Sequence, residues 1–153
     1  MSLAEKRKAK RINCATLCPE WECRQPGEYE GIWVVGELED GSISEPSLQM
    51  LTPARTMAQK LGTFVEGIVL GPDEGTARAA AEEMIRRGAD RATIIVGEEL
   101  RDRIPALMAS AIASLAEERR PDVILMSATM RGREIAPYVA ALLRAGITAD
   151  CTQ

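Results

Sequence analysis

The residues best suited to chemistry in this sequence are a threonine, a glycine and two arginines near its carboxyl end. Thr129, Arg131, Gly132 and Arg133 lie between an apolar run and an amphipathic segment. The first residues of a helix leave backbone N–H groups without partners, and two guanidinium groups would add positive charge. That combination suits an anion or a phosphate, so these four residues form a candidate cofactor-binding loop. In the alternative interpretation, Thr129 only caps the helix and the arginines face solvent or a partner.

Three cysteines near the amino end are the candidate metal ligands. Cys14 and Cys18, followed by a proline, have the spacing that closes a bacterial ferredoxin cysteine run, and Cys23 lies a little further along. Zinc sites and iron–sulfur clusters take four ligands, so three thiols need one from elsewhere. The alternative is that these cysteines are ordinary reduced thiols.

Several common chemistries are excluded by residues that the sequence lacks. The chain has no histidine, which removes the most frequent general base and the Ser-His-Asp arrangement. The glycine-rich phosphate-binding patterns are also missing, although Gly36, Gly71 and Gly97 each follow an apolar run. Such glycines serve tight turns more often than ligands. The sequence therefore predicts a protein that is not an enzyme.

Composition and charge restrict the class of protein further. The chain has 153 residues, the size of one domain, with 46% apolar and 3% aromatic residues, so its core must be aliphatic. The formal net charge of −4 provides no basic field for nucleic acid. No apolar stretch approaches the roughly 20 residues of a membrane span, and no signal peptide is apparent. We expect a cytoplasmic protein with reduced cysteines.

The order of apolar segments predicts the fold. Residues 1–30 lack any regular period and are expected to be a flexible or appended arm, so the domain is expected to span residues 31–153. Unbroken apolar runs indicate strands that are covered on both faces, as in a parallel sheet. These runs are Ile32–Val35, Phe64–Leu70, Thr93–Val96 and Val123–Met126.

Amphipathic segments alternate with these strands. The clearest covers about 102–118, with Ile104, Met108 and Ile112 on its apolar face. Two others bury Ala77, Ala80, Ala81, Met84 and Ile85, and Ile135, Val139, Leu142 and Leu143. A first helix either starts at Thr52, with Pro53 at its first position, or follows a bend. The alternation predicts an α/β fold, a three-layer α/β/α sandwich around a mostly parallel sheet.

One stretch of the sequence resembles a signature of the electron transfer flavoprotein alpha family. Residues 127–141 are Ser-Ala-Thr-Met-Arg-Gly-Arg-Glu-Ile-Ala-Pro-Tyr-Val-Ala-Ala, where the family has roughly G-A-T-x-x-G-R-[DE]-[LI]-A-P-R-[LV]-A. Residues 145–152 are similar to the family's T-G-L-T-A-D-C-T. The resemblance covers about residues 31–153 and departs from the family at Ser127, which replaces Gly, and at Tyr138, which replaces Arg.

The resemblance implies a fold, a cofactor and partners. The fold would be the Rossmann-like, adenine nucleotide alpha hydrolase-like form of the sandwich. The parent protein would be a heterodimeric electron carrier between flavin dehydrogenases and downstream acceptors. FAD is expected in a carboxyl-terminal alpha domain that this chain does not reach, and any AMP in the partner subunit. This chain would supply the interface with the beta subunit and a scaffold for the flavin domain.

Two other functions remain open from the sequence. The chain could be a stand-alone adenine-nucleotide-binding module, with the nucleotide held by the loop from Thr129 to Arg133. It could also be a purely architectural domain.

Overall fold

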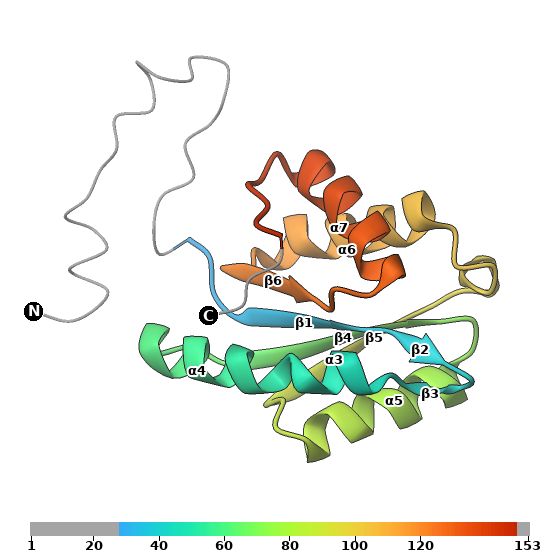
Figure 1. Cartoon of the computed structure of the whole chain (residues 1–153), viewed down its shortest axis with the longest axis horizontal. Helices are drawn as coiled ribbons and strands as arrows, with labels where there is room; N and C mark the ends of the chain where they lie inside the picture. Colours follow the sequence, from blue (N-terminus) through green and yellow to red (C-terminus); the bar gives the residue numbers. More distant parts are fainter. Residues whose placement is uncertain (1–27, 150–153) are drawn as a thin grey trace, which may run out of the picture.

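The computed structural model describes residues 28–149 of the chain. A parallel four-stranded sheet forms the middle layer of this part (Figure 1). Its strands are β1 (Ile32–Gly36), β4 (Val65–Gly71), β5 (Arg91–Val96) and β6 (Val123–Met126), in the spatial order β5-β4-β1-β6. The two inner strands, β1 and β4, are buried along their whole length. The prediction of four parallel strands from the apolar runs is confirmed.

Helices cover both faces of the sheet, as Figure 1 shows. One face carries α6 (Pro105–Arg119) and α7 (Met130–Leu143), and the other carries α3 (Glu45–Gln49), α4 (Leu51–Leu61) and α5 (Glu74–Arg86). The short strands β2 (Leu38–Glu39) and β3 (Ser42–Ile43) pair with each other after β1, and a 3₁₀ turn, η1 (Glu98–Leu100), precedes α6. The predicted α/β/α sandwich is confirmed. Within residues 28–149, no helix combines the length and apolar character that a membrane crossing requires.

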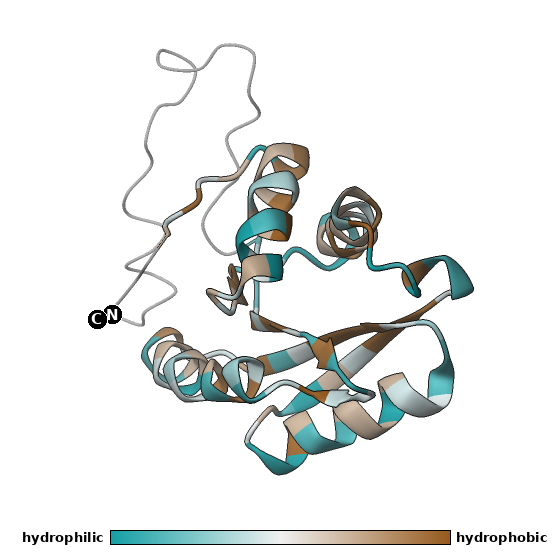
Figure 2. Cartoon of the chain, turned by 45° about the vertical axis from the view of Figure 1, so that its right-hand side comes forward, coloured by the Kyte–Doolittle hydropathy of each residue, from teal (hydrophilic) through white to brown (hydrophobic). Residues whose placement is uncertain are grey.

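Successive side chains of each strand point to opposite faces of the sheet, so the strands contribute to two apolar cores, one on each face. Ile32 and Val34 of β1 pack toward α3, α4 and α5, whereas Trp33 and Val35 pack toward α6 and α7. Figure 2 shows the result, with apolar strands in the centre and polar residues spread over the outer sides of helices. Because both faces of the sheet are covered, side chains pointing to either face are removed from water. This explains why polar residues do not alternate with apolar ones along the strands.

The helix faces differ in part from those expected. Ile104 is the N-cap of α6 and is half exposed, and Ile85 and Leu142 are half exposed as well, so their predicted burial was wrong. Met108 and Ile112 are buried as predicted, and the rest of the buried side of α6 consists of Ala109, Ala113 and Ala116. Alanines allow α6 to approach the sheet and α7 closely, which turns its larger side chains toward the flanks.

The first helical segment is two helices that join at Met50. Of the two alternatives left open by the sequence, the bend is correct, because α3 ends at Gln49 and α4 begins at Leu51. Pro53 then lies in the first turn of α4, where a backbone N–H has no helical partner to lose. α7 begins at Met130, and Arg144 has the left-handed conformation that ends it.

A buried carboxylate ties the amino ends of β4 and β5 to the end of α6. Glu66 is fully buried on β4, and its Oε1 accepts hydrogen bonds from Thr93 Oγ1 at 2.7 Å and Arg119 Nη1 at 2.8 Å. Its Oε2 accepts one from Arg91 Nη2 at 3.1 Å. The Arg91 guanidinium also lies over the Phe64 ring, 3.8 Å from its centre. Because a buried charge is costly without partners, these residues must act as a unit.

We predict that Glu66→Gln lowers the free energy of unfolding by about 2–3 kcal/mol, because an amide cannot accept from all three donors. Urea denaturation at neutral pH measures the change. The control is Glu74→Gln, which removes a carboxylate from an exposed i, i+4 pair with Arg78 and should change stability by less than about 0.5 kcal/mol. Equal effects of the two substitutions would contradict the assigned role of Glu66.

Candidate functional site at the carboxyl edge of the sheet

The carboxyl ends of β1 and β6 lie side by side because the two strands are parallel neighbours. Val35 is in register with Met126, so the residues that follow each strand, Glu37 and Ser127, meet at the same edge of the sheet. An open α/β sheet binds its ligands at this edge, between strands whose crossovers go to opposite faces. Here β1 leads to α3 on one face and β6 leads to α7 on the other, so the position is the expected ligand crevice.

In this protein the crevice is occupied by the side chain of Glu37. Ser127 Oγ donates a hydrogen bond of 2.7 Å to Glu37 Oε1, and Thr129 Oγ1 lies 2.7 and 2.8 Å from the two carboxylate oxygens. Thr129 is also the N-cap of α7, since its Oγ1 accepts from the Gly132 backbone N–H at 3.0 Å. A negative charge at a helix N-terminus is favourable, and hydrogen bonds to an ionised acceptor are stronger than neutral ones.

The backbone of Glu37 is fixed as firmly as its side chain. Its N–H donates to Ser47 Oγ at 2.9 Å, and its carbonyl oxygen accepts from the Ser44 N–H at 2.8 Å. The hydroxyl groups of Ser44 and Ser47 are themselves 2.9 Å apart, and both serines are buried. Glu37 therefore links β1, the start of α3 and the start of α7.

Gly132 allows α7 to begin this close to β6. A Cβ atom built on Gly132 would lie 1.9 Å from the Ser127 carbonyl oxygen, a distance that no side chain can occupy. The sequence suggested a role in anion binding for this glycine, whereas its contacts give it a packing role. The close approach brings Thr129 within reach of Glu37.

The two arginines of the candidate loop lie at its exposed rim. Arg131 Nη1 is 3.5 Å from the Leu38 carbonyl oxygen, and Arg133 Nε donates to the Ala128 carbonyl oxygen at 3.2 Å. The structure thus gathers the four predicted residues at the start of α7 and confirms that Thr129 caps the helix. An external ligand for Thr129, Arg131, Gly132 and Arg133 stays a prediction, since the anion beside Thr129 belongs to Glu37.

Carboxylates also follow the other two strands. Asp73 caps α5 after β4, and the Thr76 backbone N–H, with help from its hydroxyl, lowers the pKa of Asp73. Glu98 follows β5, and its hydrogen bond to Arg101 lowers the pKa of Glu98. Both groups are therefore ionised at neutral pH. With Glu37 they place three carboxylates along this edge, of which Glu98 is paired with Arg101. Glu37 takes the hydroxyl groups that a phosphate of FAD or AMP would need, so the residues do not fit such a phosphate while Glu37 is in place.

Gly36 and Gly71, which end β1 and β4, lie in close contact with neighbouring side chains. A Cβ on Gly36 would lie 2.6 Å from Ile43 Cδ1, and one on Gly71 would lie 3.2 Å from Ala77 Cβ and Leu38 Cδ1. Gly36, Gly71 and Gly97 are absent from the positive-φ glycines. The structural interpretation holds, but the reason is close contact rather than a turn conformation.

The sequence analysis missed Glu37, the residue at the centre of the site. The available signal was a carboxylate directly after a buried strand, at the edge where Ser127 and Thr129 were also expected. Using it required the strand order, because β1 and β6 are neighbours in the sheet but far apart in the sequence. Within residues 28–149, no group of carboxylates or thiols is arranged to hold a metal. Cys14, Cys18 and Cys23 lie outside the described residues.

The layers and the position of the crevice define a Rossmann-like α/β fold. A solved universal stress protein in complex with cAMP is similar in fold, with a TM-score of 0.52 and 21% identity over 76% of this chain and 92% of that one. Residues 32–153 match the family model of the electron transfer flavoprotein domain, so the chain belongs to the electron transfer flavoprotein family.

Two relatives carry the match to alpha subunits. The electron transfer flavoprotein subunit alpha of Clostridium acetobutylicum is 34% identical over 125 residues, which cover 82% of this chain and 36% of that protein. Protein FixB of Rhizobium meliloti is 35% identical over 132 residues, 85% of this chain and 37% of that protein. The predicted resemblance is confirmed. The chain spans little more than a third of the length of these relatives.

We predict that Gly132→Ala lowers the free energy of unfolding by about 3 kcal/mol, because the methyl group forces α7 away from Ser127. Chemical denaturation measures the loss. The matched control is Gly75→Ala in the first turn of α5, where the nearest atom outside the chain neighbours is Asp73 Oδ1 at 3.4 Å. That variant should be neutral or slightly more stable, given the helix propensity of alanine. A harmless Gly132→Ala would refute the close approach.

We predict that Glu37→Ala costs about 2–3 kcal/mol of stability, because the buried Ser127 hydroxyl loses its acceptor and α7 loses its counter-charge. The matched control is Glu39→Ala, an exposed carboxylate two residues further on, with an expected change below about 0.5 kcal/mol. Hydrogen exchange should show faster opening of the first turn of α7 in the Glu37 variant alone. Unchanged hydrogen-exchange protection in the first turn of α7 would contradict the assigned role of the Glu37 contacts with Ser127 and Thr129.

Proposed function

We propose that this chain acts as the amino-terminal alpha-subunit domain of an electron transfer flavoprotein. In that role it belongs to a cytoplasmic electron carrier that passes electrons from flavin dehydrogenases to downstream acceptors. The domain itself supplies the interface with the beta subunit and a scaffold for the flavin domain, and it has no catalytic residues of its own. The family match and the two alpha-type relatives support this proposal.

The observation that favours a scaffold is the occupied crevice. Glu37, Ser127 and Thr129 satisfy one another's hydrogen bonds at the edge where the fold would otherwise take a ligand. A phosphate at this place would have to displace the Glu37 carboxylate from the hydroxyl groups of Ser127 and Thr129. FAD therefore belongs to a different domain of the full-length protein, where it supplies the redox chemistry, and any AMP belongs to the partner subunit.

The competing hypothesis is a stand-alone adenine-nucleotide-binding module. The fold that this chain shares with a cAMP-bound universal stress protein makes it worth testing. In that hypothesis the nucleotide phosphate would lie on Thr129, Arg131, Gly132 and Arg133 and displace Glu37. The energetic cost of breaking the Glu37 hydrogen bonds argues against it.

We predict that the purified chain is colourless and binds a coexpressed beta subunit from the same genome, but shows no heat of binding with AMP or ATP at micromolar concentration. Absorbance near 450 nm, size-exclusion chromatography and isothermal titration measure these three properties. A yellow protein would contradict the placement of FAD. Micromolar AMP binding that is lost in Arg131→Ala and Arg133→Ala would favour the nucleotide module. Metal and sulfide analysis of anaerobically prepared protein tests the prediction for Cys14, Cys18 and Cys23.

A further inference from the structure

The outer face of α7 is apolar although it faces solvent. We define this outer face by Met130, Pro137, Tyr138, Ala141 and Leu142, all of which are exposed. Met130 is 82% exposed, and Tyr138 and Leu142 are about half exposed. The opposite side of the helix, with Ile135 and Val139, is buried against the sheet and α6. Isolated exposed apolar residues are ordinary, but several on one helix face indicate an interaction surface.

The residues of this face have the spacing that helix packing requires. Met130, Tyr138 and Leu142 belong to one row of residues spaced by four, which also contains Glu134. In the neighbouring row, Pro137 and Ala141 are smaller than Met130, Tyr138 and Leu142. A helix of another protein can set a row of its own side chains between two such rows.

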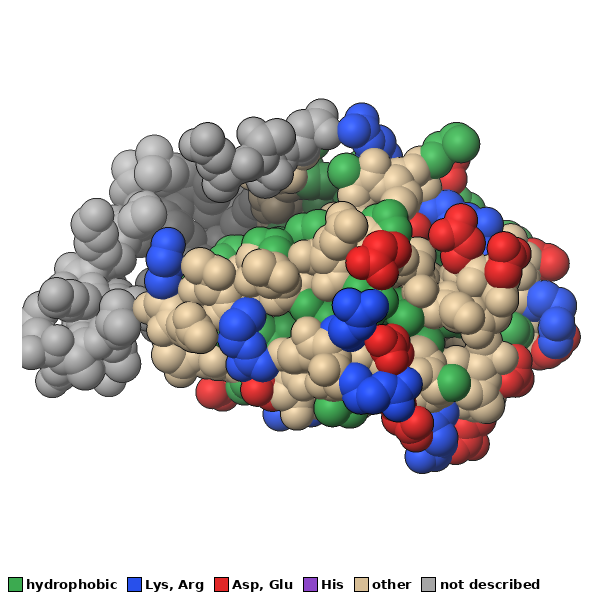
Figure 3. Space-filling view, turned by 60° about the horizontal axis from the view of Figure 1, so that its bottom comes forward, with side chains coloured by type: hydrophobic (Ala, Val, Ile, Leu, Met, Phe, Trp, Pro, Cys, Tyr) green, Lys and Arg blue, Asp and Glu red, His purple; other side chains and the backbone are tan. Residues whose placement is uncertain are grey.

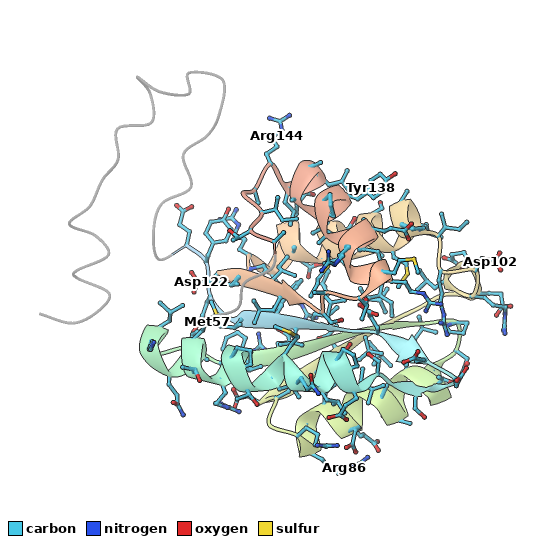
Figure 4. The ribbon with its side chains drawn as sticks, in the orientation of Figure 1. Met57, Arg86, Asp102, Asp122, Tyr138 and Arg144 are labelled. Carbon is cyan, nitrogen blue, oxygen red and sulfur yellow. The ribbon has the colours of Figure 1, made fainter. Side chains whose placement is uncertain are left out.

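The charges around this face are unmatched within the described residues. Arg131 and Arg144, at the two ends of α7, have no carboxylate partner in residues 28–149, and Tyr138 and Arg144 point away from the body of the protein (Figure 4). On the face formed by α3, α4 and α5, basic and acidic side chains lie close together (Figure 3). Arginines of those helices pair with carboxylates, as in Arg78–Glu74 and Arg87–Glu83.

We propose that the outer face of α7 docks a non-identical protein subunit that presents an apolar helix flanked by carboxylates. This inference rests on the proposed function, in which the beta subunit binds the domain, and it assigns the surface used and the chemistry of the partner. Unpaired arginines in a chain of net charge −4 favour an acidic partner.

Two other occupants fit the surface less well. A second copy that paired its α7 antiparallel about a twofold axis would bring Arg131 of one copy near Arg144 of the other, which places like charges together. An anionic membrane would be repelled by the net negative charge of the chain, and one helix face offers it little apolar area.

Binding to the coexpressed beta subunit, measured by biolayer interferometry with the full chain, tests the inference. We expect Tyr138→Ser/Leu142→Ser to weaken the complex at least about tenfold, as truncation of central apolar contacts does. Arg131→Glu/Arg144→Glu should slow association several-fold and reduce its dependence on salt. The matched controls are Ile85→Ser, an exposed apolar residue of α5, and Lys60→Glu, an exposed cation of α4, which should bind like the original chain.

The outcomes separate this inference from the proposed function. If the original chain binds and the α7 variants bind equally well, the docking face is wrong while the proposed function stands. If the original chain does not bind the beta subunit at all, both fail. Self-association in sedimentation, or binding to phosphatidylserine vesicles, that the α7 variants abolish would identify another occupant and overturn the inference. Circular dichroism and thermal unfolding establish that the variants are folded.

Discussion

The contact between the Glu37 carboxylate and the hydroxyl groups of Ser127 and Thr129 holds the functional edge of this domain together. It joins the ends of two adjacent strands and completes the cap of α7. Glu37 also reaches α3 through its backbone, so helices on opposite faces of the sheet depend on one residue. A charge can occupy this position because its hydrogen-bond donors come from rigid elements and need no further ordering.

The same contact places a side chain of the protein where this kind of fold commonly binds an anion. In an open parallel sheet, helix N-termini and free backbone N–H groups gather at the carboxyl edge, and an anion there is stabilised whatever its source. Here the anion is a side chain of the protein. Gly132 and the buried serines 44, 47 and 127 fix the surrounding backbone, so the edge gains rigidity.

Local sequence patterns predicted most of the helices and strands. They could not predict contacts between residues that are far apart in the sequence. The apolar runs located all four strands because burial on both faces leaves a signal in every residue of a strand. The buried side of α6 was misjudged because its alanines are as compatible with solvent as with a core, so periodicity favoured larger neighbours such as Ile104. Glu37 and Glu66 were missed for a different reason. Each is explained by partners on other strands and helices, and only the strand order brings these together.

Two carboxylates at opposite ends of the sheet, the buried Glu66 and the partly buried Glu37, bear on where the domain can bind a partner. Glu66 fixes the end of α6 to β4 and β5 at the amino edge, and Glu37 fixes the start of α7 at the carboxyl edge. α6 and α7 pack against each other between these two points, so the layer they form is held at opposite ends. A rigid helix loses little freedom when it docks, and this lowers the cost of binding. The exposed row of Met130, Tyr138 and Leu142 lies on α7, whose start is held by Glu37, so apolar contacts made there need little further ordering of the helix.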